Sequence, residues 1–316
     1  MSTREVWIDI LKGIGILMVI LGHIKGFWFP IYRFVYTFHM PLFFMISGYL
    51  FKSSDTFKGL MNYVLKLSKR LMIPYLVFLP LMNFLLDMPY SSRDLFYGGG
   101  GLMGGLGIAW FVTDLFISLC IFQVLHILKL VKIWMAILLL IIAYLLSDKI
   151  PPLWGGNIVP MSIVYVYCGH YIKLYESRIN NSIRNKVIFD AMFLLGLFVL
   201  GCFVSSVRMD MKHANYGIPV ISFTISVIAS VSLAKICQSI KRKNMIVDAL
   251  CFCGRNSFSL MLIHLYIIMI SYVILPGDTI LFGFARFWLV LSICICCIVI
   301  WNQSKKIIGL WLAKIR

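Results

Sequence analysis

Charged side chains are scarce in this sequence. They make up 13% of its 316 residues, and only 12 residues are acidic. A soluble domain carries about a quarter charged residues, so an ordinary soluble fold is excluded. Hydrophobic residues instead reach 61%. The sequence therefore predicts an all-α, polytopic integral membrane bundle. The length leaves no room for a sizeable soluble domain beside the spans, so we expect a single integral domain over residues 1–316.

Metal-site spacing is also missing. The nine cysteines lie mostly inside apolar segments. The pairs Cys251/Cys253 and Cys294/Cys296 have neither the spacing nor the four ligands of a zinc site. We interpret them as small packing residues. No metal site and no permanently bound cofactor are expected.

Positive charge is abundant, with a net charge of +17, but it does not indicate nucleic acid as a partner. The basic residues cluster between apolar segments, as expected of loops that face anionic membrane lipids. Hydropathy predicts about ten spans, at 7–28, 31–51, 71–88, 107–128, 131–147, 158–175, 187–207, 217–237, 257–275 and 281–303. Alternating loops then carry twenty basic residues on one side and seven on the other. This asymmetry predicts a cell (inner) membrane protein with both termini cytoplasmic.

The first span carries three ionisable side chains, Asp9, Lys12 and His23. On a helix, Lys12 and His23 fall within about 20° of each other, and Asp9 lies about 40° from His23. Ionisable groups at membrane depth are costly, so such a stripe usually faces a bundle interior or a wet cavity and marks a working site. The alternative is that Asp9 and Lys12 form an interfacial pair and that His23 simply lies at the outer edge.

The second predicted span contains another histidine, His39, two residues before Pro41. The proline is expected to kink the helix and free backbone groups. Two histidines at similar depth on adjacent spans could share one polar pocket, where a neutral imidazole serves as general base for a hydroxyl. Two interhelical hydrogen-bonded histidines would explain the same pattern.

Five stretches make the sequence resemble a known family. They are Asp9–Ile16 with Leu21-Gly22-His23; Phe38–Phe44 with Ile46–Tyr49; Lys69–Tyr75; Ala109-Trp110-Phe111 with Asp114; and Gly254–His264. Together and in this order they resemble the membrane acyltransferase-3 family, in particular its fucose 4-O-acetylase-like and polysaccharide O-acetyltransferase branch. One departure is Lys12, where the family often has arginine. Lysine lacks the two-pronged contact of a guanidinium, which weakens any detailed role for that position.

The resemblance implies transfer of an acetyl or similar acyl group from cytoplasmic acyl-CoA to a hydroxyl of a carbohydrate or lipid-linked glycan, and acetyl-CoA is the expected donor. It implies His23 as general base, with His39 orienting or polarising, although an acyl-histidine intermediate is equally open. Candidates for the donor path are Asp9, Lys12, Lys69, Arg70 and Arg255. Candidates for acceptor contacts are Arg33, Trp110, Asp114, Asn256 and His264. Interhelical hydrogen bonds would explain Asp114, Asn256 and His264 equally well.

Two other functions fit parts of the pattern. A glycan or small-solute transporter also uses intramembrane charges and broken helices. However, the chain shows no matching pair of Gly/Pro-broken segments in two halves. A sensor or scaffold with an inactive pocket is the other alternative. The presence of both His23 and His39 argues against a pocket that has lost its catalytic residues. Transport without acyl-CoA consumption, or binding without turnover, would distinguish these alternatives from an enzyme.

Overall fold

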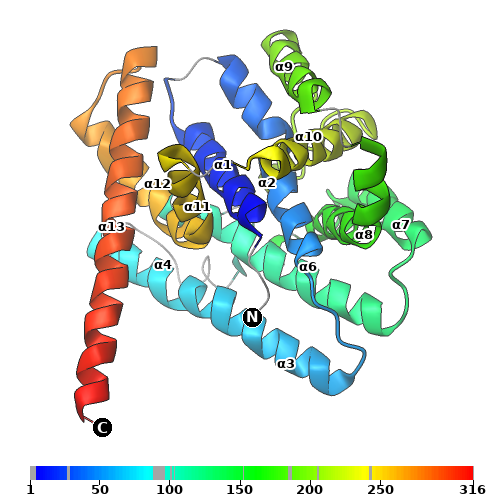
Figure 1. Cartoon of the computed structure of the whole chain (residues 1–316), viewed down its shortest axis with the longest axis horizontal. Coiled ribbons are helices and arrows are strands. Elements are labelled where there is room, and N and C mark those ends of the chain that lie inside the picture. Colours follow the sequence, from blue (N-terminus) through cyan, green and yellow to red (C-terminus); the bar gives the residue numbers. More distant parts are fainter. Residues whose placement is uncertain are drawn as a thin grey trace. The chain divides into compact units, whose positions relative to one another are not determined.

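A computed structural model describes residues 5–26, 29–87, 97–99, 102, 104–151, 153–183, 187–204, 206–241 and 244–315. Within these ranges the chain is helical with no β-strand, which confirms the all-α class (Figure 1). The chain divides into two compact units. Unit 1 combines Met1–Tyr32 with Lys241–Arg316, and unit 2 is Arg33–Ile240. Each unit is described by itself below, and a single domain over 1–316 stays a prediction.

Unit 1 brings the two ends of the sequence together. Its helices are α1 (Val6–His23), α11 (Met245–Arg255), α12 (Ser257–Ile274) and α13 (Ile280–Ile315). Helix α1 packs most extensively against α11 and also contacts α12, while α12 packs along α13 (Figure 1). The stretch from 254 to 264 predicted to carry a motif therefore lies against the stretch from 9 to 23.

Unit 2 contains the remaining helices and begins within α2 (Phe29–Tyr49). In order these are α3 (Phe57–Leu67), η1 (Ser68–Met72), α4 (Ile73–Leu85), η2 (Gly104–Ile108), α6 (Ala109–Ile127), α7 (Ile133–Leu146), η3 (Leu153–Gly155), α8 (Val159–Ile183), α9 (Val187–Phe203), η4 (Met211–His213) and α10 (Ile221–Ser239). Helix α6 packs against α8 and α3, and α9 packs against α10. Element η1 is a π-helical turn, a distortion often found at functional sites.

The predicted count of about ten spans is not reproduced. Five helical segments in the described ranges are long and apolar enough to cross a bilayer: Val6–His23, Gly104–Ile127, Ile221–Ser239, Ser257–Ile274 and Ile280–Ser304. Two shorter apolar helices coincide with the spans predicted at 131–147 and 187–207. The other three predicted spans are helices α2, α4 and α8. Helix α4 is only 13 residues long, and polar side chains interrupt α2 and α8.

The first helix also ends earlier than expected. It stops at His23 rather than continuing to residue 28, because Ile24 is extended and Gly26 adopts a φ of +97°. That backbone conformation favours glycine. A side chain at Gly26 would also press on the backbone of Thr279, just before α13. The turn after His23 is therefore held against α13.

The side of the membrane on which each terminus lies stays a prediction. Several of the basic residues counted for that prediction lie outside the described residues: Arg4, Arg93, Arg184, Lys186, Arg242, Lys243 and Arg316.

Candidate active site

Helices α1 and α11 of unit 1 meet at two glycines. A Cβ on Gly13 would overlap the backbone carbonyl of Leu250, and a Cβ on Gly254 would overlap the carbonyl of Asp9. Glycine at both positions allows the two backbones to approach within a distance that any side chain would prevent. The close approach fixes Asp9 beside the C-terminal end of α11.

An ion pair lies at this crossing. Arg255, the last residue of α11, places its Nε 3.3 Å from Oδ2 of Asp9. The Asp9 side chain is buried, whereas that of Arg255 is 54% exposed. One face of the guanidinium is therefore available to an anionic ligand while the buried carboxylate orients it. Two of the predicted donor-path residues are brought together here, and Lys12 is half-buried on the next turn of α1.

The far end of α1 carries a pair of histidines. His23 is the last residue of the helix and is exposed. Its ring centroid lies 5.3 Å from that of His264 on α12, and the two rings are tilted by 43°. His264 itself is fully buried. The predicted partner of His23 was His39 on the second span, and sequence reasoning had placed His264 only among the acceptor contacts.

The hydrogen bonds of His264 determine its tautomer. Its Nδ1 lies 2.7 Å from the carbonyl oxygen of Met261 and 3.2 Å from that of Leu260. Because carbonyl oxygens only accept, Nδ1 must carry the proton in the neutral ring, which leaves a lone pair on Nε2. That Nε2 is buried and has no hydrogen-bond partner within the described residues. Nearly all buried polar atoms in proteins are paired, so this acceptor calls for an explanation.

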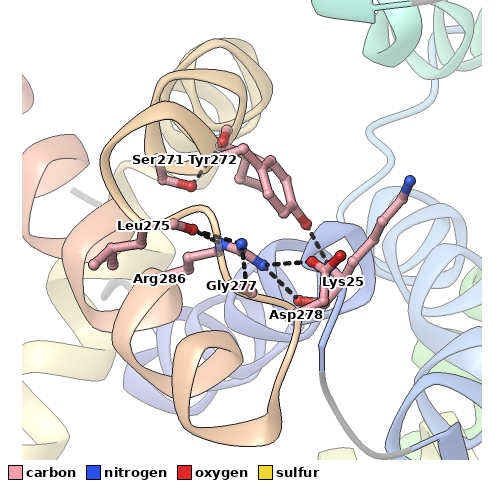
Figure 2. A network of polar contacts seen from close by, with 8 residues as sticks. Lys25, Ser271, Tyr272, Leu275, Gly277, Asp278 and Arg286 are labelled. Carbon is pink, nitrogen blue, oxygen red and sulfur yellow. Dashed lines mark hydrogen bonds and ion pairs between the residues drawn. The ribbon is translucent and has the colours of Figure 1, made fainter.

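A buried arginine fixes the turn that follows His23 (Figure 2). Arg286 of α13 is fully buried and donates to the carbonyl of Lys25 at 3.3 Å. It also donates to the carbonyls of Leu275, at the end of α12, and of Gly277. Its guanidinium lies 4.0 Å from the ring centroid of Tyr272.

Two further contacts complete this cluster. The hydroxyl of Tyr272 accepts the backbone N–H of Lys25 at 2.5 Å, so both backbone groups of Lys25 are bonded (Figure 2). Arg286 Nη1 also lies 3.5 Å from the exposed carboxylate of Asp278. A cation at the ends of α1 and α12 interacts favourably with both helix dipoles. The sequence prediction counted Arg286 only among the basic residues of the loops. Its position as a lone arginine near the start of an apolar run is the signal that could have identified it.

The remaining candidates of unit 2 are arranged differently. His39 is buried, and its Nδ1 lies 2.8 Å from the carbonyl of Val35 on the same helix. Its ring packs edge-on against Tyr36 at 4.8 Å. His39 and His23 belong to different units, so their cooperation stays a prediction. Arg33 is half-buried in the second turn of α2.

Asp114 is fully buried and bonded on both oxygens. Ser118 donates to Oδ1 at 3.2 Å, and Ser162 of α8 donates to Oδ2 at 2.6 Å. The carboxyl group thus links α6 to α8. Of the two interpretations left open by the sequence, this geometry favours the interhelical one. Trp110, one turn earlier, is buried against Phe111.

Asn256 and the basic pair before α4 complete the predicted set. Asn256 separates α11 from α12 and donates through Nδ2 to the carbonyl of Phe252 at 2.9 Å, which favours a structural role. Lys69 and Arg70 lie exposed on the π-helical turn η1. Their exposure fits contact with an anionic ligand. No cluster of three or more metal-binding side chains occurs in the described part of the chain.

Comparison with known proteins identifies the family. Residues 5–301 match the family described as Acyltransferase domain, the acyltransferase-3 family. The chain belongs to this family. The chain is 25% identical over 237 residues to Nodulation protein NolL of Sinorhizobium fredii, covering 68% of this chain and 61% of that protein. It is 31% identical over 147 residues to Nodulation protein NolL of Mesorhizobium japonicum, covering 42% and 39% respectively.

The match thus spans less than two thirds of the length of either relative. No solved structure matches the chain. The family and the apolar helices together identify a multi-pass membrane protein of the acyltransferase-3 family. The family expected from the sequence is confirmed.

Proposed function

We propose that this membrane acyltransferase moves an acetyl group from cytoplasmic acetyl-CoA to a hydroxyl of a carbohydrate, such as a surface-glycan unit or its lipid-linked precursor, at a bacterial cell membrane. The observation that supports this most is the meeting of two distant motifs in unit 1. The segment around Asp9 and His23 packs against the segment around Arg255 and His264. At one end of this contact Arg255 provides a cation for a phosphate, and at the other end His23 provides an imidazole for a hydroxyl.

The proposed reaction uses His23 as general base. The neutral imidazole takes the proton from the acceptor hydroxyl as its oxygen attacks the thioester carbonyl. The C–O bond forms, the C–S bond breaks, and the imidazolium returns the proton to the leaving thiolate. His39 is retained as a second proposed orienting group. A direct transfer of this kind and an acyl-histidine intermediate remain separate proposals for experiment.

The proposed donor path uses cations to bind the phosphates of the coenzyme. Arg255 is the best placed, because Asp9 orients it and half of its side chain is exposed. Lys69 and Arg70, exposed on η1, and Lys12 on α1 are the other proposed contacts. Arg33, Trp110, Asp114, Asn256 and His264 were proposed for the acceptor. For Asp114 and Asn256 the observed hydrogen bonds make packing the better-supported role.

The test is acyl transfer by the purified protein in liposomes. Labelled acetyl-CoA and longer acyl-CoAs are offered with a panel of sugars and lipid-linked glycans. We expect acceptor-dependent CoA release that falls about 10²–10⁴-fold in His23→Ala, the range lost with a general base. His213→Ala is the control, because His213 lies exposed in η4 beside Asp210.

The outcomes separate the competing functions. Equal turnover in His23→Ala and wild type would contradict the assignment of the base and make His39 the next residue to test. Acyl-CoA consumption with no acceptor in the panel would contradict a carbohydrate acceptor. No acyl-CoA binding or consumption under any condition would contradict the donor and favour a transporter.

A further inference from the structure

The unpaired Nε2 of His264 is the feature of unit 1 that the proposed reaction has not yet used. Leaving a buried acceptor without a donor costs about 1–3 kcal/mol. The neutral side chain has one N–H group, and it donates this group to the carbonyls of Leu260 and Met261 in its own helix. These bonds do not link α12 to another helix. Interhelical hydrogen bonding therefore does not explain why a histidine stands at this position.

The neighbouring ring is that of His23, whose centroid lies 5.3 Å from the centroid of His264. An imidazole N–H is a suitable donor for an imidazole lone pair. Hydrogen bonds between catalytic groups are often long or poorly aligned without substrate and shorten in the reactive complex. This arrangement resembles a general base that is oriented by a third group. Here His23 is the base, and the neutral His264 takes the place of the usual carboxylate.

We propose that His264 is a positioning residue that sets the tautomer of His23. When the substrates bind, the N–H of His23 donates to Nε2 of His264, and the opposite nitrogen of His23 presents its lone pair to the acceptor hydroxyl. This inference rests on the proposed acyl transfer and adds the group that controls its base. This role replaces the acceptor contact predicted for His264 from the sequence, because a residue that acts through His23 touches neither substrate.

The protons balance over one turnover. The hydroxyl proton moves to His23, which then carries a proton on both nitrogens and keeps its hydrogen bond to His264. When the C–S bond breaks, the same proton passes from His23 to the thiolate of CoA. His264 ends as it began, with Nδ1 protonated and Nε2 as acceptor. No other reactant is required.

The choice of histidine over aspartate has a physical reason. An ionised carboxylate in the middle of a membrane helix costs several kilocalories per mole. Asp9 avoids this cost by pairing with Arg255 near the helix end. His264 lies in the third turn of α12 and is fully buried. A neutral acceptor orients His23 there at a far lower desolvation cost.

Two substitutions separate the role of Nε2 from that of Nδ1. In His264→Asn the amide nitrogen replaces Nδ1 and keeps a donor for the carbonyl of Met261, while the acceptor toward His23 is removed. In His264→Gln the longer side chain places an amide oxygen near the position of Nε2 and restores an acceptor. Both variants and His213→Ala are assayed with the full-length protein in liposomes, with acetyl-CoA and the acceptor that the wild type uses.

We expect kcat to fall about 10²-fold in His264→Asn, with the KM for acetyl-CoA within about twofold of wild type. His264→Gln should recover at least about tenfold of that loss. A kcat near wild type in His264→Asn would overturn the proposal. Equal losses in both variants that follow their thermal stability would also overturn it, because they would show a packing role.

A double variant gives the decisive readout. If His264 acts only through His23, adding His264→Asn to His23→Ala lowers kcat no further than His23→Ala alone. A further loss that multiplies the single effects would overturn the proposal. If the wild type transfers acyl groups and His264→Asn is unimpaired, only this inference fails. If wild type and His213→Ala both transfer none, the proposed function fails and the inference with it.

Discussion

The two units use the same device to bring a pair of helices together. In unit 1, Gly13 and Gly254 let the backbones of α1 and α11 meet. In unit 2, Gly48 and Gly169 do the same for α2 and α8, since a Cβ at either position would overlap the carbonyl of Val166 or Met45 respectively. Reciprocal glycines at a close crossing are common in membrane bundles and carry no information about chemistry. The close helix crossing therefore has a structural role in both units.

The polar groups near these helices show where the units differ. In unit 2 the buried Asp114 receives a hydrogen bond on each oxygen from Ser118 and Ser162. In unit 1 the buried His264 keeps one nitrogen unpaired beside His23. A completed pair stabilises packing, whereas an unpaired acceptor is ready to receive a proton donor. Unit 2 also holds buried polar atoms without a partner among the described residues, on Gln123 and Asn157, so this property alone does not distinguish the units. The proposal that the base lies in unit 1 rests on the contact between His264 and His23, and the predictions below test it.

Gly254→Ala should have the largest effect on activity. The new methyl group overlaps the carbonyl of Asp9, so α1 must shift, and a shift of about 1 Å in a reacting group can cost about 10²-fold in rate. We expect kcat of the folded protein to fall by about that factor. Gly169→Ala is the matched variant, because it creates the same overlap with Met45 in unit 2.

Both glycine variants should lose roughly 1–3 kcal/mol of stability through overpacking. Thermal unfolding in detergent gives the folded fraction, to which turnover is normalised. Only Gly254→Ala should then remain impaired. Equal impairment of the two folded variants would remove the distinction between the units.

Arg286→Met should have the next largest effect, and mainly on stability. The change leaves the carbonyls of Leu275, Gly277 and Lys25 without their donor, each at about 1–3 kcal/mol. We expect a loss of roughly 3 kcal/mol or more by detergent unfolding, with lower kcat because the turn after His23 is released. Arg208→Met in unit 2 is the control, since its contact with Asp210 is long at 4.0 Å and partly exposed. Its expected change is within about 0.5 kcal/mol.

Arg255→Ala should have an intermediate effect that is confined to the donor. Loss of one charge-assisted contact to a phosphate corresponds to about a tenfold rise in the KM for acetyl-CoA. The KM for the acceptor should be unchanged in the same titrations. Lys149→Ala, which removes an exposed cation of unit 2, should leave both constants as they are. A rise in the acceptor KM alone would place Arg255 on the other substrate.

Asp114→Asn should have the smallest kinetic effect. The amide keeps an acceptor for one serine and loses the other bond, which costs about 1–2 kcal/mol in thermal unfolding. We expect kcat and both KM values within about threefold of wild type. A large rise in the acceptor KM without destabilisation would show that Asp114 contacts the acceptor after all.

The sequence predicted the fold class, and two of the stretches that it assigned to the site pack together in unit 1. The 3.6-residue period placed Asp9, Lys12 and His23 on one stripe, and α1 does run through all three. The residues around Arg255 were assigned to the same function. Local patterns of this kind are visible because they repeat within one helix.

The pairing across helices was not predictable from these patterns. His39 was expected beside His23 because the two spans are consecutive in the sequence. The residue actually found beside His23, His264, comes 241 positions later. Hydropathy also predicted more spans than the five long apolar helices found in the described residues. The span predicted at 71–88, for example, is part of a continuous helix that runs through α3, η1 and α4. Tertiary packing decides which helices are neighbours, and the patterns within one helix do not predict it.

The bond between Arg286 and Lys25 joins residues 261 positions apart and has a consequence for biosynthesis. A ribosome that has made α1 has already produced His23, but the arginine that fixes the following turn is made 261 residues after Lys25. The arrangement proposed for catalysis is therefore completed only after α13 has been made. An unfinished chain that lacks Arg286 contains the proposed base, His23, but not the hydrogen bonds that fix the turn after it. We therefore expect such a chain not to consume acetyl-CoA.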